Sequence, residues 1–368
     1  MKMRNVSVLL GLCLLFVGAS VQVKAQTWTF TGSMAQSRNY FTATLLNNGL
    51  VLVVGGSTRG SIISYGLASA ELYNPATGTF SSTGSLSTGR YGHTATLLTN
   101  GKVLIAGGTN NTTRLSSAEL YDPSTGTFTV TGSMHATRGT AATLLPSGMV
   151  LFAGGYDGTN FLSSAELYNP LTGSFVLTGN LNNARAGHSA TLLTNGLVLI
   201  AGGDNASGAF TSSELYNPTT GAFANTGSLN TARAGQTATL LNNGQVLIAA
   251  GQGNGANGGY LGSAELYNPA TGKFTVTGSL NTPRYLDTAH LLNSGQVLIV
   301  AGNHFGSIAS AELYNPSTGT FSNTASLNTP RQGHASALLP NGQVLAVGGC
   351  ESQLGNRLGY LASAELYH

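Results

Sequence analysis

Few side chains in this sequence could do chemistry, and those that could are spread along the chain. Three of the seven histidines, His93, His188 and His334, stand at equivalent positions of a repeated segment. Equivalent positions of a closed repeat array are distributed around it, which disfavours a shared metal site. Apart from the repeated glutamates and a turn aspartate, the acids available for catalysis are Asp157, Asp204, Asp287 and Glu351.

One apparent nucleotide motif is better explained as a loop. Residues 253–258 read Gly-Asn-Gly-Ala-Asn-Gly and match the pattern G-x-G-x-x-G after a strand-like run. A dinucleotide site also needs a helix that opens at this motif. Here more glycine and another strand-like run follow, so the sequence predicts a long loop.

The elements that must position these residues come from a repeat. The tripeptide Glu-Leu-Tyr begins at seven places, 47 to 53 residues apart: Glu71, Glu119, Glu166, Glu214, Glu265, Glu312 and Glu365. A repeat of this length built from short β-like runs is typical of a propeller.

Each repeat predicts four antiparallel strands. In the second copy, residues 93–98 and 102–106 are apolar runs joined by Asn-Gly, a strong hairpin signal. Residues 117–121 and 127–131 follow, joined by Pro-Ser-Thr-Gly. Four antiparallel strands in succession make one propeller blade.

The two ends of the chain predict how the ring closes. The last Glu-Leu-Tyr copy has no fourth strand after it, whereas residues 27–34 match the fourth-strand segment 127–134. We therefore expect the N-terminal strand to complete the C-terminal blade, which removes exposed sheet edges. The prediction is an all-β, seven-bladed propeller over residues 26–368.

These features resemble the kelch repeat: a strand ending in Gly-Gly, a loop, Glu-Leu-Tyr-Asn-Pro and then an aromatic residue. Phe takes the place of the usual fourth-strand Trp in six blades, with Trp28 as the exception. The kelch family implies mostly binding roles, and it includes the propeller domain of galactose oxidase and some sugar-converting enzymes. Galactose oxidase would imply copper held by tyrosine and histidine, with a cysteine–tyrosine crosslink. No local pattern around Cys350 matches that site, so we expect no cofactor and no metal.

The N-terminus and the composition predict export. Lys2 and Arg4 precede an apolar run at 6–17, and Val23-Lys24-Ala25 offers a cleavage site, so residues 1–25 are predicted to be a signal peptide. Without them the 15 basic residues fall to 12, equal to the 12 acids. A nucleic-acid partner would need a basic stripe, and none exists. We expect a secreted, periplasmic or cell-surface protein with no membrane span after cleavage.

The variable loops predict which face carries function. The Asn-Gly and Pro-x-Thr-Gly turns barely change between copies, whereas the loop after Gly-Gly and the connection between blades vary. Seven arginines in those connections and the seven repeated glutamates suggest one structural ion pair per blade. The loop after Gly-Gly is longest in blades 1, 5 and 7, so we expect the ligand near the closure. The predicted ligand-binding residues are Asn39, Tyr40, Arg59, Tyr65, Tyr91, Asp287, Glu351, Arg357 and Tyr360.

Taken together, the sequence favours a secreted binding or interaction module over an enzyme. Aromatic rings beside amides and hydroxyls suit a carbohydrate or a protein as the ligand. The alternative is a small-molecule, sugar-converting enzyme, an isomerase or an oxidoreductase, at the channel mouth and centred on Glu351, Asp287 and His334. A structural component of the cell envelope is a third possibility. An enzyme needs a carboxylate and a histidine or arginine that converge in a pocket, which the fold can test.

Overall fold

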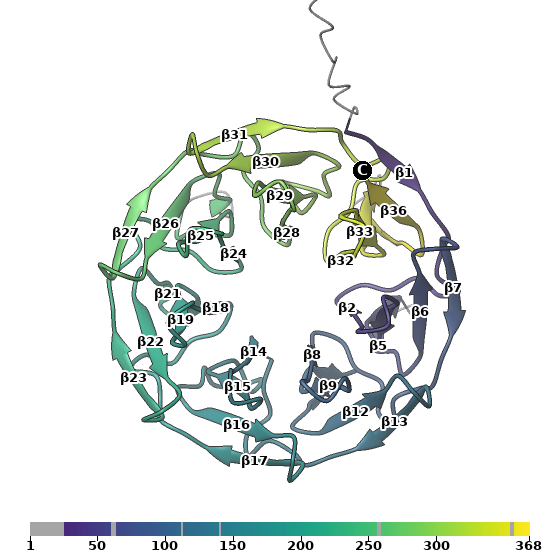
Figure 1. The fold of residues 1–368 in the computed structure, drawn as a ribbon, viewed down its shortest axis with the longest axis horizontal. Helices are drawn as coiled ribbons and strands as arrows, with labels where there is room; N and C mark the ends of the chain where they lie inside the picture. The colour runs from purple at the N-terminus through teal and green to yellow at the C-terminus, as the bar shows by residue number, and fades with distance from the viewer. Residues whose placement is uncertain (1–25, 60–63, 112, 140, 256–258, 354–356) are drawn as a thin grey trace, which may run out of the picture.

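The computed structural model describes residues 26–59, 64–111, 113–139, 141–255, 259–353 and 357–368. These residues form seven four-stranded antiparallel sheets, arranged as a ring around a central channel (Figure 1). The prediction of an all-β, seven-bladed propeller is confirmed. The predicted signal peptide, residues 1–25, lies outside the described residues. No helix in the described part of the chain is long and apolar enough to cross a membrane.

The blades follow one another in sequence, each from its innermost to its outermost strand. Blades 1 to 3 consist of β2 (Thr42–Leu45), β3 (Val51–Val54), β6 (Ala70–Asn74) and β7 (Thr79–Ser82); β8 (Thr94–Leu97), β9 (Val103–Ala106), β12 (Ala118–Asp122) and β13 (Thr127–Val130); β14 (Ala142–Leu144), β15 (Val150–Ala153), β16 (Ala165–Asn169) and β17 (Ser174–Leu177). Blades 4 and 5 consist of β18 (Ser189–Leu192), β19 (Val198–Ala201), β22 (Ser213–Asn217) and β23 (Ala222–Asn225); β24 (Thr237–Leu240), β25 (Val246–Ala249), β26 (Ala264–Asn268) and β27 (Lys273–Val276). Blades 6 and 7 consist of β28 (Thr288–Leu291), β29 (Val297–Val300), β30 (Ala311–Asn315) and β31 (Thr320–Asn323); β32 (Ala335–Leu338), β33 (Val344–Val347), β36 (Ala364–Tyr367) and β1 (Trp28–Phe30).

In four blades, the loop after the second strand contains a short two-stranded hairpin. They are β4 (Ser57–Arg59) with β5 (Ser64–Gly66), β10 (Thr109–Asn110) with β11 (Thr113–Arg114), β20 (Asp204–Asn205) with β21 (Gly208–Ala209), and β34 (Cys350–Gln353) with β35 (Arg357–Tyr360). The longest of them, β34–β35, belongs to blade 7 at the closure.

The ring is closed by the N-terminal strand, as predicted. Trp28 lies opposite Tyr367 and Phe30 opposite Glu365 in the antiparallel pair of β1 with β36. In Figure 1 the purple β1 runs along the outside of the yellow β36. Trp28 Nε1 also donates to the carbonyl of Ala325 in the preceding blade, at 3.0 Å. The seventh sheet therefore joins the two ends of the described chain.

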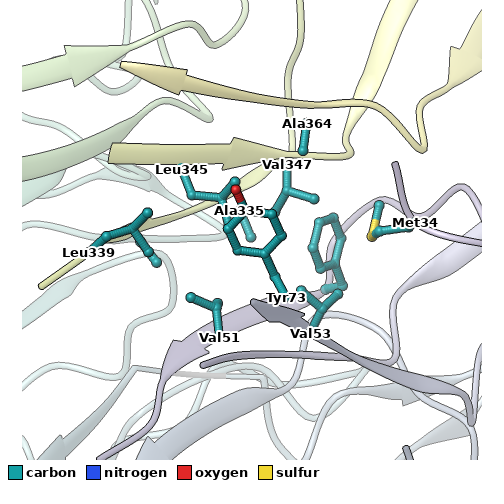
Figure 2. Close-up of a cluster of buried hydrophobic side chains, with 11 residues drawn as sticks. Met34, Val51, Val53, Tyr73, Ala335, Leu339, Leu345, Val347 and Ala364 are labelled. Atoms are coloured by element: carbon teal, nitrogen blue, oxygen red, sulfur yellow. The ribbon is translucent and has the colours of Figure 1, made fainter. Parts of the chain in front are cut away.

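Apolar side chains between neighbouring blades form the core. The second strands, such as Val103–Ala106, are buried along their whole length because a blade covers each of their faces. Figure 2 shows the cluster between blades 7 and 1, where Tyr73 and Val53 from blade 1 meet Val347 and Leu345 from blade 7. Burial of this kind stabilises a fold by about 25 cal/mol per Å² of apolar surface. The closure of the ring is thus packed as well as hydrogen-bonded.

Each blade also holds one buried ion pair, as the repeated residues predicted. In blade 4, Arg185 Nη2 lies 3.0 Å from Glu214 Oε1, and its Nη1 donates to the carbonyl oxygens of Gly202 and Ser212. Burial lowers the pKa of Arg185, while the charge of Glu214 opposes that shift. The seven pairs are Arg38–Glu71, Arg90–Glu119, Arg138–Glu166, Arg185–Glu214, Arg233–Glu265, Arg284–Glu312 and Arg331–Glu365. They fix the connection between blades to the third strand and are structural.

A repeated glycine sets the spacing between blades. A Cβ added to Gly227 would lie 2.1 Å from the carbonyl oxygen of Gly272, in the Pro-x-Thr-Gly turn of the next blade. Five further glycines meet the next turn in the same way: Gly32, Gly84, Gly132, Gly179 and Gly278. The equivalent residue before blade 7 is Ala325, and blade 7 has no such turn, because β36 pairs with β1 instead. At the other six positions, the carbonyl oxygen of the next blade's turn leaves no room for a Cβ. Blade 7 lacks this carbonyl, so alanine is accommodated at position 325.

Candidate functional site

A pocket of about 260 Å³ opens at the channel mouth, on the face of the variable loops. Four blades contribute the two residues that precede their innermost strands. The lining residues are Tyr40, Phe41, Gly92, His93, Leu286, Asp287, Gly333 and His334. The larger cavities lie on the opposite face, between the repeated Asn-Gly and Asn-Pro turns of neighbouring blades. None of them is lined by a buried carboxyl or a buried histidine, so the pocket at the channel mouth is the candidate site.

The backbone at this mouth adopts a left-handed conformation. Gly92, Gly187, Gly235 and Gly333 precede the innermost strand of their blades and have φ between 58° and 63°. Hydrogen bonds connect consecutive blades here, as from Gly235 N to Gly187 O at 2.8 Å. Only glycine adopts this conformation without steric cost. The four glycines therefore fit a turn that the fold imposes.

Two blades place a large residue in the same turn. Tyr40 has φ 53° and Leu286 has φ 56°. A left-handed conformation costs such residues about 1–2 kcal/mol relative to a right-handed one. The backbone hydrogen bonds persist at Tyr40, whose N donates to Gly333 O and whose O accepts from Gly92 N. Both strained residues line the same pocket.

Asp287 is the titratable group with the greatest potential for chemistry. Both of its carboxylate oxygens are buried and have no partner at ordinary hydrogen-bond distance within the described part of the chain, although other atoms of the residue are partly exposed. Looser interactions with the Thr237 side chain and with its own backbone amide act to lower its pKa. Burial raises the pKa of this carboxyl to about 7, against the opposing charge of Arg284. Arg284 itself is engaged with Glu312 at 2.6 Å. The carboxyl is therefore poised to exchange a proton near neutral pH.

The two histidines of the pocket are neutral. Burial lowers the pKa of His93 and of His334 to about 3, helped by the positive charge of a neighbouring arginine. Nε2 of His93 lies 3.0 Å from Thr42 Oγ1, and Nε2 of His334 lies 3.0 Å from Thr288 Oγ1. Each of these hydroxyls belongs to the innermost strand of the preceding blade. The histidines therefore join blades and add no charge to the pocket.

Tyr40 presents a protonated phenol beside this pocket. The residue is 44% exposed. Burial of the hydroxyl raises the pKa of Tyr40 to about 12, and Tyr285, Cys350 and Tyr360 contribute in the same direction. The Tyr40 hydroxyl makes no hydrogen bond among the described residues. It is free to bind a ligand as a donor or an acceptor.

An aromatic cluster continues the rim over blades 5 and 6. Tyr260 stacks on Tyr285 with ring centroids 5.4 Å apart, and it meets Phe305 edge-on at 5.0 Å. His304 contacts Tyr260 and Phe305 at 5.7 and 4.9 Å. Phe305 is 70% exposed. Because Tyr285 also neighbours Tyr40, this aromatic rim reaches the pocket.

The structure brings only some of the predicted site residues together. Tyr40 and Asp287 line the pocket, and Tyr360, opposite Cys350 in β34–β35, neighbours Tyr40. Asn39 is buried, and its Nδ2 lies 3.6 Å from Cys350 Sγ while its Oδ1 accepts from Tyr40 N. Asn39 is therefore used within the fold.

The other predicted residues are not among those that line the pocket. Tyr65 lies opposite Thr58 in β4–β5, and the Tyr91 hydroxyl donates to Asn111 O at 3.2 Å. Glu351 lies in β34 as an electrostatic neighbour of Arg331. Arg59 and Arg357 have their backbones in β4 and β35, and their side chains lie outside what the structure describes. The ligand-binding set as a whole stays a prediction.

The prediction missed His93, Leu286 and Tyr285 as residues at or beside the pocket. A signal for Leu286 was present in the sequence, because it occupies the position that is Gly92, Gly187, Gly235 and Gly333 in other blades. Tyr40 shares that signal. His334 and Asp287 were predicted as an alternative catalytic centre, and the structure places both in the pocket wall.

Comparison with known proteins supports the fold and redirects the function. The Kelch motif family matches residues 90–135, which confirms the kelch resemblance. No curated protein sequence matches the chain. A solved structure of a novel fungal alcohol oxidase, with catalytic diversity among the AA5 family and in complex with copper, matches with a TM-score of 0.76 and 16% identity. The match covers 94% of this chain and 76% of that one, and at this identity it establishes the fold alone.

The prediction of a binding or interaction module is contradicted by this comparison. That solved structure, which matches over 94% of this chain, is an oxidase, so the fold is not confined to binding modules, and the alternative prediction of a small-molecule enzyme is the better supported of the two. The preference for a binding role rested on exposed aromatic residues and on the lack of a catalytic motif. Neither feature distinguishes a binding surface from an active site, because the residues of an active site can be distant in sequence and come together only in the folded protein.

The copper of that oxidase raises the question of whether the channel mouth could hold a metal ion. Within the described ranges, no three histidine, cysteine, aspartate or glutamate side chains lie close enough to bind a metal ion. His93 and His334 each direct Nε2 to a threonine hydroxyl of another blade. The two histidines of the pocket are therefore already engaged within the fold, and they do not fit copper as free ligands.

Proposed function

We propose that this protein is an exported enzyme that acts on a small, neutral, hydroxyl-bearing molecule at the channel mouth. The observation that carries the proposal is Asp287, a buried carboxyl in the wall of a pocket, with no partner at ordinary hydrogen-bond distance among the described residues and a pKa of about 7. Perturbed carboxyls of this kind cluster at catalytic sites. The predicted signal peptide at residues 1–25 supports export.

The chemistry that Asp287 offers is general acid–base catalysis. Near pH 7 the carboxylate and the carboxylic acid are both populated, so the group takes a proton from a hydroxyl or an adjacent carbon and returns it. This step suffices for the isomerisation of a hydroxy-carbonyl compound such as a sugar, in which no electrons are gained or lost overall. The neutral histidines and the Tyr40 phenol supply polarity without charge, which suits an uncharged substrate such as a monosaccharide.

The size of the pocket supports a small substrate. A volume of about 260 Å³ corresponds to roughly nine water molecules at the density of the liquid. The opening accommodates one sugar ring or a short polyol. A longer carbohydrate would place its remaining rings on the aromatic rim of Tyr260, Tyr285 and Phe305.

The test is turnover by the purified protein on neutral sugars and alcohols. Proton exchange into the substrate is followed by NMR in heavy water. We expect activity that rises through pH 7 and falls at least ~100-fold in Asp287→Asn. Asp157→Asn is the matched control, because Asp157 is exposed and bonded to Thr159 and Asn160 of its own loop. Unchanged turnover in Asp287→Asn, or no turnover on any substrate, would overturn the proposal.

A further inference from the structure

Two residues at the channel mouth hold a backbone conformation that four other blades give to glycine. Tyr40 and Leu286 have φ 53° and 56°, and the equivalent Gly92, Gly235 and Gly333 have φ 60°, 63° and 58°. The strained pair comes from blades 1 and 6, which flank blade 7. Gly333 of blade 7 lies between them in the lining of one pocket.

Neither side chain is needed to form the turn. Glycine makes the same turn in four blades, and it does so without steric cost. Tyr40 is 44% exposed, so its ring gains little from packing. Strained residues that stability does not require are typical of functional sites.

We propose that Tyr40 and Leu286 determine the specificity of the channel-mouth pocket. The Tyr40 hydroxyl binds a ligand hydroxyl, and Leu286 covers the C–H face of the same ligand from the other side of Gly333. The ligand is a compact, neutral molecule that carries both hydroxyl groups and an apolar face. This inference rests on the proposed function only in taking the same pocket.

Three features of the site favour this ligand. The Tyr40 hydroxyl makes no hydrogen bond among the described residues, and its raised pKa keeps it protonated throughout the physiological range. Gly92 and Gly333 leave the main chain open on either side of Tyr40. The two histidines in the wall are neutral, so the site offers no positive partner for an anionic ligand.

The experiment measures ligand binding and thermal stability of the full chain together. The probes are D-glucose, myo-inositol, glycerol and cyclohexanol, detected by saturation-transfer NMR and titrated for Kd. We expect Tyr40→Phe to weaken binding of the hydroxyl-rich probes about 10-fold, the equivalent of one hydrogen bond. Tyr40→Gly and Leu286→Gly weaken binding at least as much, yet their Tm stays equal or rises by ~2 °C because the strain is released.

A matched control separates strain from recognition. Asn111 also has a positive φ, 52°, but does not line the pocket. Asn111→Gly is therefore expected to leave binding unchanged. Wild-type affinity in both glycine variants, a clear loss of Tm in both, or no binding of any probe to the wild-type protein would each overturn the inference.

The two proposals fail in different ways. If Asp287→Asn keeps its turnover while the Tyr40 and Leu286 variants lose binding, the catalytic role is wrong and the specificity role stands. If Asp287→Asn loses turnover while the Tyr40 and Leu286 variants bind as the wild type does, the reverse holds.

Discussion

Trp28 and Tyr367 face each other across the strand pair that closes the ring, with ring centroids 5.2 Å apart. Trp28 is buried and also bonds the Ala325 carbonyl of blade 6. This single side chain thus connects both ends of the described chain and two blades. Phe30, two residues further along the same strand, pairs through its backbone with β36, but its side chain is 60% exposed.

Trp28→Ala is therefore expected to lower the free energy of unfolding by about 3–5 kcal/mol, the usual loss for a large buried aromatic side chain. Chemical denaturation followed by circular dichroism measures the change. Phe30→Ala serves as the control and should change stability by less than ~0.5 kcal/mol. Equal effects of the two substitutions would mean that the closure does not depend on Trp28.

The ion pairs within the blades predict a second stability effect. Glu214→Gln leaves the shape of the side chain but removes the charge that faces the buried Arg185. An uncompensated buried charge is costly, so we expect a loss of about 3 kcal/mol. Asp122→Asn is the control, because the Lys102–Asp122 pair is solvent-exposed. A Glu214→Gln protein as stable as the wild type would show that these pairs are not structural.

The glycine that separates two blades predicts a packing effect. Gly227→Ala forces a Cβ against the Gly272 carbonyl and should destabilise the fold by about 1–3 kcal/mol through overpacking. Thermal unfolding monitors the change. Ala325→Gly, at the equivalent place without that carbonyl, should have a smaller effect. The opposite order would contradict the proposed contact between blades.

The buried histidines predict a loss of stability in acid. Burial lowers the pKa of His188 from 6.5 to about 3, so between these values the unfolded chain binds a proton that the folded chain does not. Stability is therefore full above pH 6.5 and falls as the pH drops toward 3, by up to about 1.4 kcal/mol per pH unit for each such histidine. His188→Gln, which introduces the residue that blade 5 has at Gln236, should flatten this slope. Denaturant midpoints between pH 4 and 7 test it, and an unchanged slope would refute it.

Asp287 predicts the opposite trend at higher pH. Its pKa is about 7 in the folded protein and 3.8 in the unfolded chain, so the folded state holds the extra proton between these values. The contribution of this proton to the free energy of unfolding is full below pH 3.8. It is lost as the pH rises through 7, and it amounts to roughly 1.4 kcal/mol per unit of pKa shift. Asp287→Asn should therefore be more stable than the wild type at pH 8, even though we expect it to be inactive. A lower Tm at pH 8 would contradict this assignment.

The repeat made the fold predictable. Seven copies of one segment specify strand order, turn types and the position of the missing strand, and each copy supports the others. The pairing of Arg38 with Glu71 was predictable for the same reason, since both recur once per blade. Strand order, turn types and the ion pair were predictable because the same residues recur in every blade.

The site was less predictable because it depends on where the blades differ. Two blades from the start of the chain and two from its end each supply two residues to the pocket, and only the ring brings Leu286 near Tyr40. The exposure of Asn39 could not be judged from its neighbours in sequence, since Cys350, which it contacts, belongs to another blade. Loop length pointed to the closure, whereas the pocket is built by the short segments before the innermost strands.

The pairing of β1 with β36 has a consequence for how the molecule is made. Of the strands in the ring, β1 is synthesised first, and it has no partner strand until β36, the last of them, has been synthesised. Until then blade 7 is incomplete, and the ring is open. The apolar surfaces of blades 1 and 6 that pack against blade 7 in the closed ring are then without their full partner. Assembly of the disc is consequently a late, long-range event, and any factor that shields Trp28 in the meantime would govern the yield of intact protein.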